Sequence, residues 1–162
     1  MSNKSIILLI FMLLPFKNPL AQNIEIEKNI IGVWQENDSL VSSGLKNVYR
    51  FYSNGKFRFD VSSYNYLSRL ISLSGKYKIR NNSLYLRVLE IKEAKGGEIT
   101  YGDEADYNNW NYYNYKEKVI TCNPAKDFSL RIKICAESKD VKCLRLNYLK
   151  FYKISSNPAA FQ

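Results

Sequence analysis

The sequence of 162 residues contains no histidine. This absence removes the Ser–His and Cys–His nucleophile pairs, the usual general base at neutral pH, and every histidine-ligated metal site. The acidic residues are few and scattered, and their one cluster lacks the regular spacing of a calcium loop: Glu98, Asp103, Glu104 and Asp106. We therefore expect a protein that is not an enzyme and that uses no metal or other cofactor.

Long apolar runs are also absent, except near the N-terminus. Residues 6–14 are consecutive apolar residues that follow a basic start containing Lys4. Such a run is too short to cross a bilayer as a helix and is typical of a secretory signal peptide. We expect residues 1–21 to be cleaved after Ala21, so that residues 22–162 form a single exported domain, periplasmic or secreted. The first cysteine is Cys122, so no lipid anchor is expected at the new N-terminus.

Acidic residues are outnumbered by basic ones, 15 to 24, which gives a formal net charge of +9. The basic side chains are spread over segments with strand-like alternation. They indicate either attraction to acidic partners, such as anionic envelope polymers, or the solvated outer face of a sheet protein, which we favour. Nucleic acid is not an expected partner outside the cell. We expect a monomer without a stable membrane anchor.

The periodicity of an amphipathic helix is scarce in this sequence. Apolar and polar residues instead alternate with a period of two, as they do in strands. The stretch "NIEIEKNI" (residues 23–30) fits either one helical turn or an extended lead-in. The segment "IIGVWQ" follows as a short strand, and further strand-like segments are separated by turn residues. This pattern predicts an all-β fold of about eight antiparallel strands, closed into an up-and-down barrel or stacked as two sheets.

The stretch "KNVYRFYSNGKFRFDV" predicts a hairpin with two competing registers. A two-residue turn at residues 54–55 would place Arg50 on the apolar face. A three-residue loop, with Gly55 in the left-handed region, keeps Arg50 on the polar face. We predict the second register, which pairs Phe51 with Phe57 and Tyr49 with Phe59.

The stretch "LSGKYKIRNNSLYLRVLEI" predicts a second hairpin, with its turn at Asn81 and Asn82 and with Tyr77 facing inward. After Lys92 the alternation dissolves, which predicts turns at Gly96–Gly97, one short strand near Ile99, and a loop of roughly twenty residues. Residues 106–112 close this loop. It carries three aromatic candidates for partner binding: Tyr107, Trp110 and Tyr112.

Further along the chain, Asn123 and Pro124 predict a turn between two strands. Residues 127–136 and 141–154 then predict a closing hairpin, and the tail from Ser155 is expected to be loose. If the closing hairpin turns around Lys139, Cys135 and Cys143 lie opposite each other on the outward face, close enough for a disulfide. We predict that pair, with Cys122 free. Three reduced thiols, or a bridge that involves Cys122, stay open as alternatives.

The segments quoted above resemble a known family when taken in order. A Gly-x-Trp strand in "IIGVWQ", an aromatic hairpin in "YRFYSNGKFRF" and the hairpin "GKYKIRNNSLYL" make residues 32–89 similar to bacterial lipocalin-like domains. The resemblance implies an eight-stranded barrel whose cavity often holds a hydrophobic ligand. It also implies structural roles for Gly32 and Trp34, with Trp34 packed under a basic side chain from the last strand. Arg145 and Lys150 are the candidates for that base.

Two function hypotheses follow. The first is an exported binding protein for a small hydrophobic or amphipathic ligand, lined by the inward aromatic residues Tyr49, Phe51, Phe57, Phe59 and Tyr77. An interior filled by these same side chains is the alternative. The second is a non-enzymatic protein-binding module, such as an inhibitor or immunity protein against a secreted enzyme or toxin. Its contact would be the aromatic loop, because tyrosine and tryptophan add contact area at low entropy cost.

Overall fold

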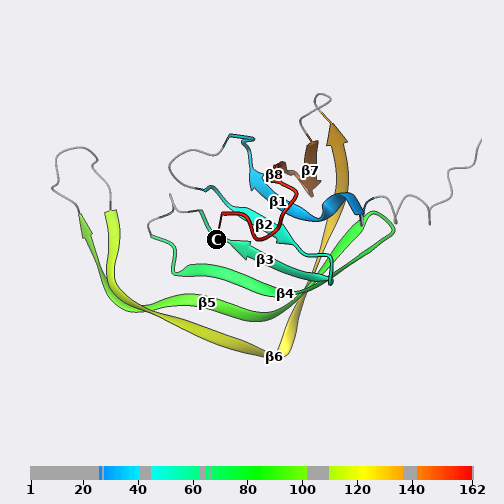
Figure 1. The fold of residues 1–162 in the computed structure, drawn as a ribbon. Coiled ribbons are helices and arrows are strands. Elements are labelled where there is room, and N and C mark those ends of the chain that lie inside the picture. Colours follow the sequence, from blue (N-terminus) through cyan, green and yellow to red (C-terminus); the bar gives the residue numbers. More distant parts are fainter. Residues whose placement is uncertain are drawn as a thin grey trace, which may run out of the picture.

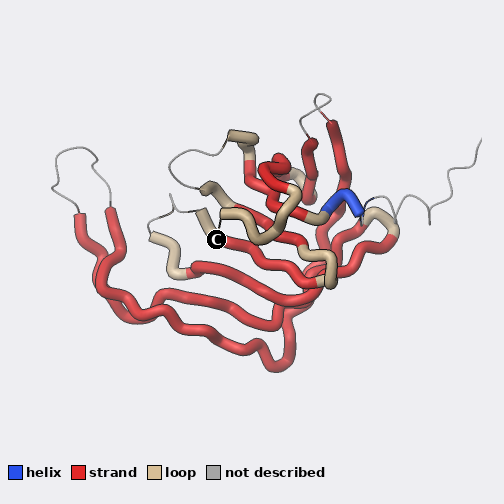
Figure 2. The backbone as a smooth tube through the Cα atoms, viewed as in Figure 1, coloured by secondary structure: helices blue, strands red, loops and turns tan. Residues whose placement is uncertain are grey.

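A computed structural model of the protein describes residues 26, 28–40, 45–62, 65, 67–101, 110–136 and 142–161. Regular structure in this part is almost entirely β (Figure 2), apart from a helical turn at residues 28–30. The strands are β1 (Gly32–Glu36), β2 (Val48–Phe51), β3 (Lys56–Asp60), β4 (Leu70–Arg80), β5 (Ser83–Tyr101), β6 (Trp110–Ala136), β7 (Lys142–Leu146) and β8 (Leu149–Ser155). The expected signal peptide, residues 1–21, lies outside the described residues. Within them, no helix is long and apolar enough to cross a bilayer.

The eight strands form one antiparallel sheet that closes on itself. Each strand pairs with the next one along the chain, and β1 also pairs with β8. Figure 1 shows the long strands β4, β5 and β6 curving beneath the shorter strands. The prediction of an all-β fold with about eight antiparallel strands is confirmed, and the sheet closes into a ring instead of splitting into two stacked sheets.

The two predicted hairpin registers are confirmed. Tyr49 lies opposite Phe59 and Phe51 opposite Phe57 in the β2–β3 ladder. Gly55 adopts a φ of 74°, and its N–H donates to the carbonyl of Tyr52 over 3.1 Å. The bulged loop is favoured because the alternative register would turn every apolar side chain of β3 away from the core. In the β4–β5 hairpin the turn is at residues 81–82, both of which have positive φ.

The predicted loop after Lys92 is wrong. β5 continues through Gly96 and Gly97 to Tyr101, and β6 begins at Trp110, directly opposite Tyr101. Only residues 102–109 connect the two strands. The glycines have φ values of 71° and 78°, yet they lie within the ladder and do not turn the chain. Cross-strand pairing therefore overrides what two adjacent glycines indicate locally.

The predicted turn at Asn123 and Pro124 is also wrong, because β6 runs through it. The peptide bond between these residues is cis. Thr121 pairs with Glu90 and Lys126 pairs with Val88, so residues 122–125 bulge opposite Leu89 and both halves of β6 keep β5 as their partner. Figure 1 shows β6 bending sharply in this region. The closing strand, in contrast, is two strands, β7 and β8, joined at Asn147, whose φ is 53°.

The interior of the ring is packed with large side chains. Those that are fully buried include Trp34, Phe51, Phe57, Leu84, Leu144 and Phe151. The indole N–H of Trp34 donates to the carbonyl of Ile30 over 2.6 Å, which ties the helical turn to β1. Lys153 of β8 lies with its ammonium 5.4 Å from the centroid of the Trp34 ring. The basic side chain over Trp34 is thus Lys153, not Arg145 or Lys150.

The C-terminal tail, expected to be loose, covers the outer face of β2. Arg50 faces outward, as predicted, yet it is only 3% exposed. Its guanidinium group bonds to Asp60 over 3.0 Å and donates to the carbonyls of Pro158, Ala160 and Phe161. A guanidinium has five N–H donors in a fixed fork, so one side chain can satisfy several tail carbonyls at once.

The predicted cysteine pair is present. Cys135 and Cys143 lie opposite each other in the β6–β7 ladder, joined as a disulfide with Cα atoms 4.9 Å apart. Cys122 is free and packs against the core. Cys143 alternates with the core residue Leu144, yet its side chain is fully buried.

Candidate binding surfaces

The aromatic residues predicted to line a cavity lie together inside the ring. The centroids of the Tyr49 and Phe59 rings are 4.7 Å apart, and those of Phe51 and Tyr77 are 5.1 Å apart in an edge-on arrangement. Phe51 and Phe57 are fully buried. These rings contact one another at the separations that aromatic pairs favour. The interior is filled by its own side chains at this level, and ligand binding there stays a prediction.

The polar ends of the two interior tyrosines are accommodated within the fold. The hydroxyl of Tyr77 donates to the carbonyl of Tyr52 over 3.1 Å. Burial raises the pKa of Tyr49 to about 12, and the nearby carboxylate of Glu36 contributes in the same direction. The phenol of Tyr49 is therefore neutral at physiological pH, so it supplies no charge to a ligand.

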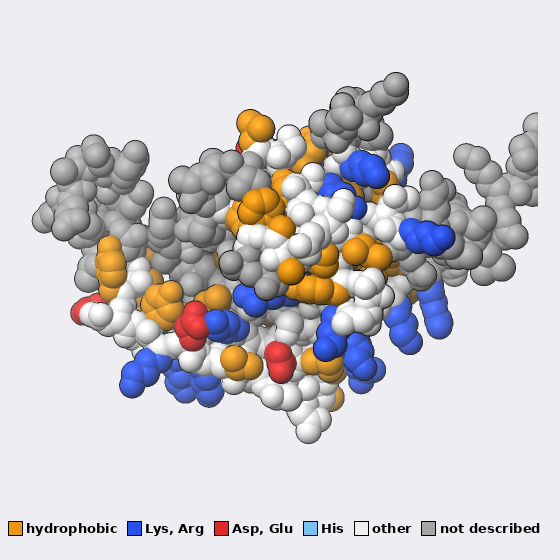
Figure 3. All heavy atoms as spheres, viewed as in Figure 1, with side chains coloured by type: hydrophobic (Ala, Val, Ile, Leu, Met, Phe, Trp, Pro, Cys, Tyr) orange, Lys and Arg blue, Asp and Glu red, His pale blue; other side chains and the backbone are white. Residues whose placement is uncertain are grey.

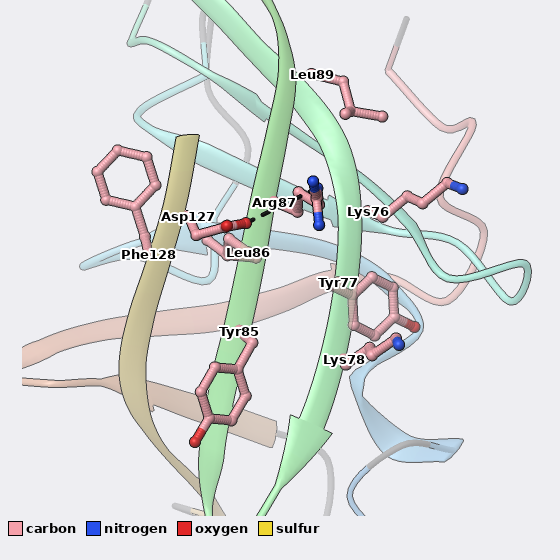
Figure 4. Close-up of a pocket in the computed structure, with 9 residues that line it drawn as sticks. All are labelled: Lys76, Tyr77, Lys78, Tyr85, Leu86, Arg87, Leu89, Asp127 and Phe128. Atoms are coloured by element: carbon pink, nitrogen blue, oxygen red, sulfur yellow. Dashed lines mark ion pairs between the residues drawn. The ribbon is translucent and has the colours of Figure 1, made fainter. Parts of the chain in front are cut away.

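A groove of about 630 Å³ lies on the sheet formed by β4, β5 and the second half of β6. It is lined by Lys76, Tyr77, Lys78, Tyr85, Leu86, Arg87, Leu89, Asp127 and Phe128. Figure 4 shows Arg87 and Asp127 at its centre, with the Phe128 ring on one side and Lys76 and Tyr77 on the other. Leu84, Leu86 and Val88 are buried, so strand alternation places Tyr85 and Arg87 on the opposite, outer face. Leu86 and its cross-strand partner Tyr77, which also line the groove, belong to the inner face.

The groove combines apolar rings with excess positive charge. Tyr85 is 46% exposed, and Phe128 is 50% exposed although it lies directly opposite the buried Leu86. The one ion pair in the groove, between Arg87 and Asp127, spans 4.0 Å between well-exposed side chains, so it contributes little stability. Figure 3 shows Lys and Arg side chains spread over the visible face of the molecule, with fewer Asp and Glu side chains among them.

Cations in the groove face one another across the strands. Lys56 lies directly opposite Lys76, and Lys76 lies directly opposite Arg87. Like charges at directly opposite positions destabilise a sheet. A second hollow, of about 360 Å³, shares Lys76 and Leu89 with the groove. An anion bound beside Lys56, Lys76 and Arg87 would relieve the repulsion among these three cations.

Beyond the pair Leu70 and Glu93, the described parts of β5 and β6 pair only with each other. We call residues 94–101 and 110–117 the arm; Figure 1 shows it projecting away from the ring. Ile99, Tyr113 and Tyr115 are exposed on it. Of the three predicted loop residues, Tyr107 lies outside the described residues. Trp110 and Tyr112 lie in β6 and not on a loop, and Tyr112 is buried.

The groove was missed by the sequence analysis because its basic residues were assigned to a solvated face. The two predicted hairpin registers do place Lys56, Lys76 and Arg87 at outward positions of their strands. The bulged turn makes Lys56 the first residue of β3, but the residue of β4 that lies opposite Lys56 is set by the register between these two strands. That register depends on the connection at residues 61–69, which is too long to fix the pairing as a tight hairpin turn does.

Comparison of the chain with protein family models, with curated proteins and with solved structures found no match. In the part of the chain that the structure describes, no three cysteine, aspartate or glutamate side chains come together in a way that could hold a metal ion. The function is therefore argued from the groove, the arm and the packed interior.

Proposed function

We propose that this chain is a lipocalin-like exported binding protein, without enzymatic activity, that holds a small amphipathic acid in the groove of β4, β5 and β6. The observation that carries the proposal is a groove of about 630 Å³ in which apolar rings and three basic side chains line the same space. Small-molecule sites typically have volumes of about 300–1,000 Å³ and combine mostly apolar walls with a few polar groups.

The lining residues favour a carboxylate with an apolar body. Lys76, Lys78 and Arg87 supply donors and positive charge, which suit a carboxylate head. Tyr85, Leu89 and Phe128 supply apolar surface for a chain or ring. The packed rings of the interior favour this outer site over a cavity inside the ring.

Two observations support the lipocalin-like and exported parts of the proposal. The closed up-and-down order of eight strands, with Lys153 over Trp34, agrees with what the resemblance implies for this family. The pairing of Cys135 with Cys143 agrees with an oxidising compartment outside the cytoplasm.

The test is displacement of a fluorescent anionic naphthalene sulfonate from the mature protein by dodecanoate, with dodecanol as the uncharged comparison. The double variant Lys76→Gln with Arg87→Gln should bind dodecanoate about tenfold more weakly, which corresponds to ~1.4 kcal/mol. Arg145→Gln is the matched control, because it removes an exposed basic side chain outside the groove. Equal affinity of the double variant and the wild type, or equal binding of dodecanol, would rule out the groove as an acid-binding site.

The arm favours a second candidate, a protein-binding module. Ile99 and Tyr113 are exposed on a ribbon that projects from the ring, and exposed apolar surface can mark an interaction site. Affinity capture from an extracellular fraction of the source organism, using the double variant Ile99→Ser with Tyr113→Ser, tests it. Tyr148→Ser, at a fully exposed turn residue, is the control. We expect only the arm variant to lose a captured partner.

A further inference from the structure

A cleft of about 410 Å³ lies at the base of the arm, apart from the groove. One wall is formed by the connection between β3 and β4 and by the start of β4, including Val61, Ser68 and Ile71. The other wall is the arm itself, including Ala94, Tyr112 and Tyr115. Neither the groove proposal nor the protein-binding candidate assigns this cleft a role.

Tyr112 carries an unsatisfied hydroxyl in this cleft. The side chain is one of the least exposed on the arm, with 9% of its surface accessible. Its hydroxyl oxygen is enclosed and has no hydrogen-bond partner among the described residues. A buried hydroxyl without a partner is unfavourable, and natural proteins rarely keep one without a structural or functional reason.

The ring of Tyr112 is held on both sides. It stacks on Tyr115 with centroids 5.2 Å apart and planes 11° apart. The guanidinium carbon of Arg69 lies 5.7 Å from the centroid of the Tyr112 ring. In the part of the chain that the structure describes, Arg69 forms no salt bridge. A positive charge therefore lies beside the ring whose hydroxyl has no acceptor among the described residues, although Arg69 itself is not among the residues that line the cleft.

The backbone of the arm is shaped to allow this arrangement. Tyr112 and Tyr115 are three residues apart and would point to opposite faces of a regular strand. Asn114 between them has a φ of 55°, and its side-chain amide donates to the carboxylate of Glu98 over 2.9 Å. A left-handed non-glycine residue inside a strand is uncommon. Its effect here is to bring both rings to one side.

We propose that this cleft binds a small carboxylate attached to a ring. Within the described part of the chain the Tyr112 hydroxyl lacks a partner, and the guanidinium of Arg69 beside it is cationic, so an anionic acceptor suits both groups. The cleft is also lined by the polar side chains of Ser62, Asn65 and Ser68. Val61, Ile71 and Ala94 line the cleft with apolar surface, and Tyr115 offers a ring face against which a second ring can stack. The ring can come from an aromatic acid or from a hexuronic acid.

The test is a titration followed by amide chemical shifts, with benzoate and glucuronate as probes and benzamide as the uncharged comparison, at constant ionic strength. We expect one of the two acids to shift the amides of β4 and the arm next to the cleft, and benzamide to leave them unchanged. A stronger response to benzoate identifies an aromatic ligand, and a stronger response to glucuronate identifies a sugar acid. Both results support the site.

Two variants test the donors separately. Tyr112→Phe removes only the hydroxyl, and Arg69→Gln removes the charge from an exposed side chain. Each should weaken binding by about fivefold or more. The control Tyr148→Phe removes a fully exposed hydroxyl and should leave the affinity unchanged.

Unchanged binding by Tyr112→Phe and Arg69→Gln would overturn the proposal, as would the absence of a response to both acids. Thermal unfolding of each variant gives a second readout, because a purely structural hydroxyl affects stability but not ligand affinity. The groove variant Lys76→Gln with Arg87→Gln separates this site from the groove. It should bind the ring-bearing acid normally, and loss of binding in that variant would place the ligand in the groove instead.

Discussion

At Arg50, a single guanidinium group holds the C-terminal residues against the outer face of β2. Its nitrogen atoms bond to the carboxylate of Asp60 and to three backbone carbonyls of residues 158–161. The side chain is almost fully buried, so these partners replace water completely. Removing such a group leaves buried acceptors unsatisfied, which costs more than losing an exposed ion pair.

We therefore predict that Arg50→Gln lowers the free energy of unfolding by about 2–3 kcal/mol, measured by urea denaturation. Arg58→Gln is the matched control, because Arg58 also bonds to Asp60 but is much more exposed, and its loss should cost less than about 1 kcal/mol. Deleting residues 156–162 in the Arg50→Gln background should add little further loss. Fully additive effects of the substitution and the deletion would contradict the claim that Arg50 holds the C-terminal tail.

Tyr49 gives a prediction about alkaline pH. Its pKa is raised from 10.0 to about 12 by burial. In this pH interval the unfolded state therefore binds fewer protons than the folded state. The stabilisation is complete below pH 10 and is lost as the pH rises through about 12. Two pKa units correspond to about 2–3 kcal/mol.

Tyr49→Phe should remove this dependence. Between pH 10 and 12 the wild type should lose about 2–3 kcal/mol more of its unfolding free energy than the variant does. Chemical denaturation of both proteins at matched pH values measures the difference. The variant keeps the lysines and other tyrosines that titrate in the same range, so the comparison cancels their contribution. Parallel pH profiles for the two proteins would show that Tyr49 does not resist ionisation.

At the scale of elements, the two hairpins with asparagine in their turns were predictable, while the long strands were not. Asn54–Gly55 and Asn81–Asn82 each lie between strongly alternating segments, so the local pattern and the pairing agree. Gly96–Gly97 and Asn123–Pro124 also indicate turns locally, but there β5 and β6 remain paired with each other. Which of these dipeptides turns the chain is decided by cross-strand pairing, which local residues do not encode.

The candidate sites also divide into those set by the local sequence and those set by pairing between distant strands. The aromatic cluster around Tyr49 was predictable because it depends on alternation within one hairpin. The groove and the cleft were not, because each needs residues from strands that are distant in sequence to lie in register. Tyr112 was identified as a candidate, but its partners Arg69 and Tyr115 depend on the path of the β3–β4 connection and on the left-handed Asn114.

Gly97 gives a prediction about the arm. A Cβ atom added there would lie 2.5 Å from the carbonyl oxygen of Tyr113, in addition to the strain of a φ of 78°. Gly97→Ala should therefore disrupt pairing in the arm, seen as faster hydrogen exchange of amides in residues 94–101 and 110–117. Because the arm lies outside the ring, exchange in β1, β2 and β8 should stay slow.

Gly96→Ala is the control for this change. Gly96 also has a positive φ, of 71°, but an added Cβ atom would have no neighbour within 4 Å. Its cost should be limited to backbone strain of about 1 kcal/mol. Equal exchange in the two variants would mean that the close approach to Tyr113 does not shape the arm.

On the scale of the whole molecule, the ring is packed inside and carries its hollows outside. The aromatic rings of β2, β3 and β4 contact one another across the interior. The basic groove and the cleft at the base of the arm are lined by different residues of the sheet region formed by β4, β5 and β6. This distribution supports the proposal that the protein binds through its surface and uses its interior for stability.

The measurement that tests this account most directly is a titration of the isotope-labelled mature protein with dodecanoate, followed by amide and methyl chemical shifts. Binding in the groove predicts that the largest changes occur at Lys76, Arg87, Leu89 and Phe128, and that Tyr49, Phe51 and Phe57 stay unchanged. Changes concentrated at Tyr49, Phe51 and Phe57 would place the ligand inside the ring, and no change at either set would contradict the proposed ligand class.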